Sequence, residues 1–60
     1  MLILEIDAIS SYFKLIDGDN IIVTSTFERM NVSDGHFIFY TDDYLYEIPV
    51  NKVIVKRKIR

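Results

Sequence analysis

The 60-residue sequence predicts an all-β fold, a small antiparallel domain of five or six strands built as a barrel or as an intertwined β-dimer. Two observations lead to this prediction. Short runs rich in isoleucine, valine, phenylalanine, tyrosine and threonine alternate with clusters of turn residues, which is typical of strands. No stretch repeats its apolar residues at the helical period. A chain of this length holds one core, so residues 1–60 are expected to form a single domain.

Strands are expected near residues 2–6, 11–16, 20–27, 36–41, 44–48 and 52–59. The segment "DGDN" at residues 17–20 predicts a hairpin between the second and third strands, because Gly18 and Asn20 both tolerate a positive φ. Gly35 marks another reversal. The segment "ERMNV" at residues 28–32 is the least readable, and three interpretations stay open: an extension of the third strand, a helical turn or a bulged loop.

The next two expected strands are joined by a turn at residues 42–43. If this turn has two residues, Phe39 lies opposite Tyr46 and Phe37 lies opposite Ile48, so that one face of the hairpin is apolar. The other face then carries a mixed set: His36, Ile38, Tyr40, Leu45 and Glu47.

The last expected strand is basic. It follows Pro49, which has no N–H for a sheet ladder and fits an edge, a bend or a short 3₁₀ turn. Residues 1–51 carry a net charge of −7, whereas residues 52–60 carry +5. The alternation of a strand points Lys52, Ile54, Lys56, Lys58 and Arg60 to one side and Val53, Val55, Arg57 and Ile59 to the other. The pattern indicates a strand docked on the core through its valines, with a line of positive charge outward.

Three interpretations of this basic strand stay open. Lysines on a terminal edge strand discourage edge-to-edge aggregation. Alternatively, the strand pairs with an acidic patch on another copy or on a partner. The third interpretation is contact with nucleic-acid phosphates, in which exposed tyrosines would stack on bases. At strand spacing, however, tyrosines more often belong to a core or an interface.

Composition predicts a protein that is completed by contact with another molecule. Half of the residues are hydrophobic, while a domain of this size buries only about 60% of the surface of its unfolded chain. The chain has no cysteine, so disulfides do not stabilise it. Contiguous exposed apolar surface usually marks an interface, and a homo-oligomer or an obligate complex is therefore expected.

The opening residues, "MLILEID", form too short an apolar run for a signal peptide. No later run approaches the roughly 18 apolar residues of a membrane span. The expected location is the cytoplasm, without membrane contact.

No pattern typical of an enzyme or a metal site is found, so no catalytic residue, cofactor or metal is expected. His36 is the single histidine, and together with Ser33 and Asp34 it falls on one turn, which is too local for a catalytic triad. The segment "DGDN" lacks the later acidic ligands of a calcium loop. Two isolated glycines do not make a phosphate-binding loop.

These observations predict a small non-enzymatic binding module, a protein-binding adaptor or inhibitor. The expected contact residues are the basic residues of the last strand and two tyrosines: Lys52, Lys56, Arg57, Lys58, Arg60, Tyr40 and Tyr44. The alternative is a regulator that binds RNA or single-stranded nucleic acid through the same strand.

Four short motifs resemble, in order, the CsrA family of small RNA-binding regulators. They are "MLIL" at residues 1–4, Gly18 and Asp19 before a β-branched run, Gly35, and "EIPVNK" at residues 47–52. The resemblance implies an intertwined all-β dimer that binds RNA. Where that family has a basic pair after its opening strand, this chain has Glu5, Ile6 and Asp7. Of the family's second RNA-contacting stretch, Val50 and the basic Lys52 remain.

A rival likeness is to SH3-like and Sm-like small barrels. The segment "EIPVNKV" resembles the proline-containing turn before the last SH3 strand, and "LIDG" followed by "MNV" resembles the Sm pattern. The sequence lacks the aromatic ligand groove of SH3 domains and the second Sm signature. This likeness bears on the fold, and a shared fold does not by itself imply a shared function.

Overall fold

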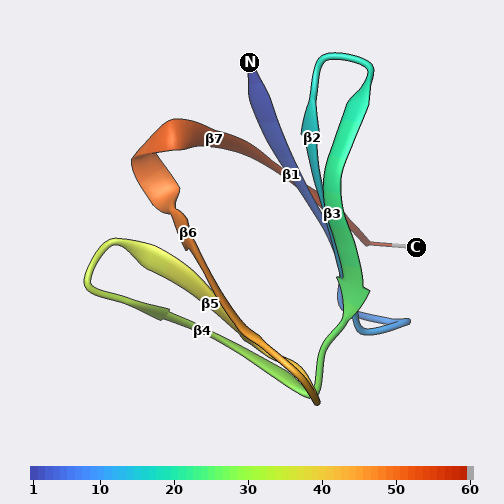
Figure 1. Ribbon diagram of the computed structural model, residues 1–60, viewed down its shortest axis with the longest axis vertical. Coiled ribbons are helices and arrows are strands. Elements are labelled where there is room, and N and C mark those ends of the chain that lie inside the picture. Colours follow the sequence, from blue (N-terminus) through green and yellow to red (C-terminus); the bar gives the residue numbers. More distant parts are fainter. Residues whose placement is uncertain (60) are drawn as a thin grey trace.

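A computed structural model describes residues 1–59, in which seven strands and one short helix occur (Figure 1). The strands are β1 (Leu2–Asp7), β2 (Tyr12–Asp17), β3 (Asn20–Thr26), β4 (Arg29–Ser33), β5 (His36–Tyr40), β6 (Leu45–Pro49) and β7 (Val53–Lys58), and the 3₁₀ helix η1 spans Val50–Lys52. The predicted all-β class is confirmed. No helix within residues 1–59 is long and apolar enough to cross a membrane.

The strands form two sheets. Sheet A has the order β3-β2-β1-β7, and sheet B has the order β4-β5-β6. The chain passes from sheet A to sheet B between β3 and β4 and returns through η1, as Figure 1 shows. Strand pairing among residues 1–59 does not join the two sheets into one closed ladder.

Two details of the predicted strand set are wrong. The described residues form seven strands instead of five or six, because residues 29–33 make a separate strand, β4, that pairs with β5. The fold is also not wholly antiparallel, since β1 and β7 run parallel, with Leu2 beside Val53 and Asp7 beside Lys58. This pairing brings segments from the two ends of the sequence side by side.

The turns follow their sequence signals with one exception. Gly18 has a φ of 62° in the β2–β3 hairpin, and Gly35 has a φ of 72°. Asp34 also has a positive φ, 51°, so both central residues of the β4–β5 turn are left-handed, as in a type I′ turn. The expectation for Asn20 is wrong, because this residue has no positive φ and begins β3. Pro49 ends β6 directly before η1, as expected.

The predicted register of β5 and β6 is confirmed. Phe39 lies opposite Tyr46, and Phe37 lies opposite Ile48. The Thr41 N–H donates to the Tyr44 carbonyl at 3.0 Å, which closes the turn around residues 42–43. The apolar face of this hairpin therefore points toward sheet A.

The core lies between the sheets. Its buried residues are Leu4, Ile6 and Phe13 from sheet A and Phe39 and Ile48 from sheet B. The rings of Phe13 and Phe39 stack with their centroids 4.1 Å apart. Aromatic pairs of this kind add stabilisation to the area that they bury. Because so few side chains are fully buried, many apolar residues lie at the surface of the described chain.

Candidate binding surface

Strand β7 contains three of the seven lysine and arginine residues and lies at an edge of sheet A. Its one neighbour within residues 1–59 is β1, so its other edge presents backbone N–H and C=O groups that no strand pairs. The prediction of an edge strand is therefore confirmed. Val53 packs against the core, but Val55 is exposed. The expectation that both valines dock the strand is not met at Val55, which is 37% exposed and is not among the residues packed against the core.

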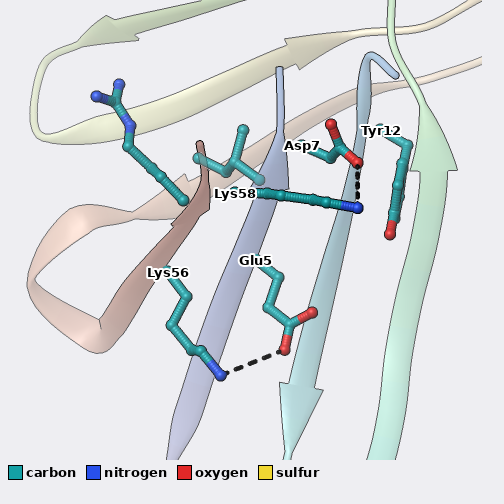
Figure 2. Close-up of a pocket in the computed structure, with 7 residues that line it drawn as sticks. Glu5, Asp7, Tyr12, Lys56 and Lys58 are labelled. Carbon is teal, nitrogen blue, oxygen red and sulfur yellow. Dashed lines mark ion pairs between the residues drawn. The ribbon is translucent and has the colours of Figure 1, made fainter. Parts of the chain in front are cut away.

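Lys56 and Lys58 lie on the outer face of sheet A, beside two acids of β1 (Figure 2). Lys56 Nζ is 3.9 Å from Glu5 Oε2, and Lys58 Nζ is 3.8 Å from Asp7 Oδ2. The two lysine side chains are 64% and 62% exposed, whereas the side chains of Glu5 and Asp7 are 37% and 6% exposed, so the weakness of exposed ion pairs applies to Lys56–Glu5. The acids nearest to the basic strand thus belong to the same chain.

Asp7 is a buried carboxylate at the end of β1. Its Oδ1 accepts hydrogen bonds from the N–H of Ile9 at 3.0 Å and from that of Ser10 at 2.9 Å, and these bonds fix the β1–β2 turn. Figure 2 shows Lys58 extending across β1 toward Asp7, beside the ring of Tyr12. Because a buried charge needs a partner, Lys58 has a structural role in addition to its charge at the surface.

Arg57 points to the other side of β7. It pairs in register with the core residue Ile6 and therefore shares the inner face of sheet A. It makes no ion pair within residues 1–59. A cleft of about 300 Å³ opens here, and its lining comes from three segments of the chain: Ile6 and Ala8, Phe27 and Met30, and Arg57, Lys58 and Ile59. The cleft thus combines apolar walls with positive charge from β7.

No family model, curated protein or solved structure matches the chain. The likenesses to the CsrA family and to SH3-like and Sm-like barrels therefore stay predictions from short motifs. The function has to be argued from the surface of the molecule.

The predicted tyrosines belong to sheet B and not to the basic strand. Tyr40 ends β5, where the guanidinium of Arg29 lies 4.0 Å from the centre of its ring. Tyr44 is exposed in the β5–β6 turn. Lys52 is exposed in η1, and Arg60 lies outside the described residues. Of the predicted residues, Lys56, Arg57 and Lys58 lie on β7, with Arg57 on the opposite face from the two lysines, and both tyrosines lie elsewhere, in β5 and in the β5–β6 turn.

Sequence reasoning missed the cleft. Its walls include Phe27 and Met30, which fall in or beside the segment whose conformation the sequence left open. The available signal was the alternation in residues 29–33, where Met30 and Val32 share one face and polar residues occupy the other. Arg29 and Asn31 are not residue types typical of strands, and their presence made the alternation of this strand hard to recognise.

The polar groups outside this region form local contacts. His36 begins β5, and its Nδ1–H donates to the Asp34 carbonyl at 2.8 Å. No group of three or more histidine, aspartate or glutamate side chains suited to a metal ion occurs in the described chain. A hydrogen bond and charge repulsion from Asp42 raise the pKa of Glu28, which is exposed, above its usual 4.5, and Arg29 opposes this shift.

Proposed function

We propose that the protein is a non-enzymatic protein-binding module, an adaptor or inhibitor, that takes up an extended segment of its partner along the free edge of β7. The observation that carries this proposal is an unpaired strand edge directly beside an apolar cleft. A segment that adds to a sheet edge gains main-chain hydrogen bonds, and pockets for its alternate side chains select its sequence. Side chains on the inner face of that segment would enter the cleft.

Charge favours an acidic segment. The preference rests on Arg57, since Lys56 and Lys58 already lie beside Glu5 and Asp7 on the outer face; the lysines oppose the pairing of this edge with an identical strand. An acidic residue beside Arg57 would find a guanidinium that has no ion-pair partner in residues 1–59. An apolar residue two positions away, on the same face of the segment, would pack on Phe27 and Met30.

RNA binding by the same strand is the second candidate, as the CsrA resemblance implies. The exposure of Lys56 and Lys58 favours it. The carboxylates of Glu5 and Asp7 on the same face oppose it, because phosphates would meet negative charge beside each lysine. A protein partner is therefore the preferred proposal. The closed barrel, the intertwined dimer and the cytoplasmic location stay predictions of the sequence.

Two synthetic peptides test the proposal. In one, phenylalanine and glutamate take turns at every second position and threonine separates them, so that both kinds of side chain reach one face of the strand; in the other, lysine replaces each glutamate. Titrated into ¹⁵N-labelled protein, the acidic peptide should shift the amide signals of β7 and of Phe27 and Met30 and leave those of β3 unchanged. Equal affinity for the two peptides, or shifts that avoid β7, would refute the proposal.

Arg57→Glu is the informative variant, because this side chain makes no ion pair among residues 1–59. It should reverse the preference between the two peptides. Lys52→Glu, in the exposed η1, is the matched control and should leave the preference intact. A titration with labelled single-stranded RNA at low and high salt tests the RNA-binding candidate. Binding that weakens steeply with salt and is lost in Arg57→Glu would favour the RNA-binding candidate instead.

A further inference from the structure

A row of four isoleucines crosses all four strands on the outer face of sheet A. In register order these residues are Ile54 of β7, Ile3 of β1, Ile16 of β2 and Ile21 of β3. Ile54 is 48% exposed and Ile21 is 57% exposed, although both are large apolar side chains. A sheet with one solvated face normally carries polar residues there. This isoleucine row is therefore an unpartnered apolar band on the face turned away from the core.

The next row along the strands is charged. Its members, in the same strand order, are Lys56, Glu5, Lys14 and Thr24. The charges run positive, negative, positive and neutral. When this order is reversed and laid over the original, Glu5 meets Lys14, Lys14 meets Glu5, and Lys56 meets Thr24. No like charges come together.

We propose that the outer face of sheet A binds the same face of a second copy of the chain. The two-fold axis runs parallel to the strands, between β1 and β2, so that each row lies over its own reversed order. Ile54 then lies over Ile21 of the second copy, and Ile3 lies over Ile16 of the second copy. Every contact occurs twice, as a closed two-fold interface requires. Sheets pack face to face in this way about 10 Å apart.

The self-complementary charge pattern identifies the occupant. An unrelated partner would have to supply its own apolar row and its own alternating charges, whereas a second copy already has both. An axis along the isoleucine row would instead stack Ile54 on Ile54 and leave Glu5 and Lys14 without partners from the second copy. The interface also leaves the free edge of β7 and the cleft beside Arg57 open, because both lie away from the outer face. The dimer and the peptide-binding function are therefore independent.

Cross-linking tests the geometry directly, since the natural chain has no cysteine. The Ile21→Cys and Ile54→Cys variants, mixed and treated with a bismaleimide that spans the roughly 10 Å between packed sheets, should give a covalent dimer. Each variant alone should give little, because two copies of position 54 would be about 17 Å apart, three strand spacings and one sheet spacing away. Equal cross-linking of Ile54→Cys alone would overturn the proposed axis.

Charge pairs test the same contact without cross-linking. Sedimentation equilibrium should give the wild type a mass near twice the 7.1 kDa of the chain. The double variant Ile21→Lys with Ile54→Lys places like charges over each other and should dissociate at least about tenfold more readily. Ile21→Glu with Ile54→Lys should recover most of that loss. Within one chain, positions 21 and 54 lie about 14 Å apart, which exceeds the screening length at physiological salt. The recovered dimer stability must therefore come from attraction between the two copies.

Val32→Lys provides the control. Val32 is 61% exposed but lies on sheet B, so its substitution should leave the mass unchanged. Circular dichroism checks that each variant keeps the all-β fold. A wild-type protein that stays monomeric at about 1 mM, where even weak dimers form, would overturn the proposal. So would a like-charge double variant that dimerises as well as the opposite-charge one.

Discussion

The ring of Phe13 stacks on the ring of Phe39, with the two planes inclined by 17°. Phe13 belongs to β2 in sheet A, and Phe39 belongs to β5 in sheet B. Both side chains are fully buried. Phe27 and Tyr46 meet this pair with tilted rings, Phe27 against Phe39 at 5.1 Å and Tyr46 against Phe13 at 5.3 Å. One aromatic cluster thus joins the two sheets.

Phe39→Ala should therefore remove most of the stability of the domain. Truncation of a buried phenylalanine costs about 3–5 kcal/mol of unfolding free energy, and a domain of this size has roughly 3–9 kcal/mol in total. Urea denaturation followed by circular dichroism measures the loss. The control is Tyr44→Ala, an exposed aromatic, which should change the free energy of unfolding by less than about 0.5 kcal/mol. A wild-type midpoint for Phe39→Ala would contradict the assigned core.

The two hairpins whose pairing depends on turn residues and on the alternation of nearby apolar residues could be predicted from the sequence. The β5–β6 hairpin is the clearest case, because a two-residue turn and the alternation of Phe37 and Phe39 fix the register and the buried face together. The β2–β3 hairpin followed from Gly18 in the same way. In both cases the residues that decide the pairing are close in sequence.

The parallel pairing of β1 with β7 could not be predicted, because no turn joins the two strands and no local pattern selects one strand as the neighbour of the other. This pairing determines most of the candidate surface. It places Lys56 beside Glu5 and Lys58 beside Asp7, and it brings Ile54 into line with Ile3. Sequence reasoning found the basic residues and their alternation, but the acids beside them depend on this contact between distant segments.

Asp7→Ala should destabilise the protein through the β1–β2 turn. The substitution removes the acceptor of the Ile9 and Ser10 N–H groups, and an intramolecular hydrogen bond contributes roughly 0.5–1.5 kcal/mol to stability. Asp7→Asn should cost less, since the amide oxygen still accepts. Thermal unfolding of the two variants measures the difference. Equal losses would show that the hydrogen bonds to the turn do not matter.

Lys58→Met should cost less than Asp7→Ala, below about 1 kcal/mol, because the Lys58 side chain is 62% exposed. Its methylene stem is kept by methionine, so the change isolates the charge opposite Asp7. A double-mutant cycle with Asp7→Asn measures the coupling between the two side chains. A coupling energy near zero would show that the ion pair adds nothing to the stability of the turn.

Glu28→Gln should stabilise the protein at neutral pH. A hydrogen bond and charge repulsion from Asp42 raise the pKa of Glu28 above its usual 4.5. The folded state therefore holds a proton that the unfolded state has released, and stability falls as the pH rises from about 4.5 through the raised pKa. Glutamine has no charge, so the melting temperature of the variant should exceed that of the wild type at about pH 7 and match it at about pH 3, where Glu28 is protonated.

Asp42→Asn should give the same pH-dependent gain, because it removes the other half of the same repulsion. The double variant should gain no more than either single variant, since the repulsion can be removed only once. Arg29 opposes the shift of the Glu28 pKa but is the smallest of its causes, so it does not alter the direction of the effect. Additive gains, or a gain that persists at about pH 3, would show that the stabilisation does not arise from the Glu28–Asp42 pair.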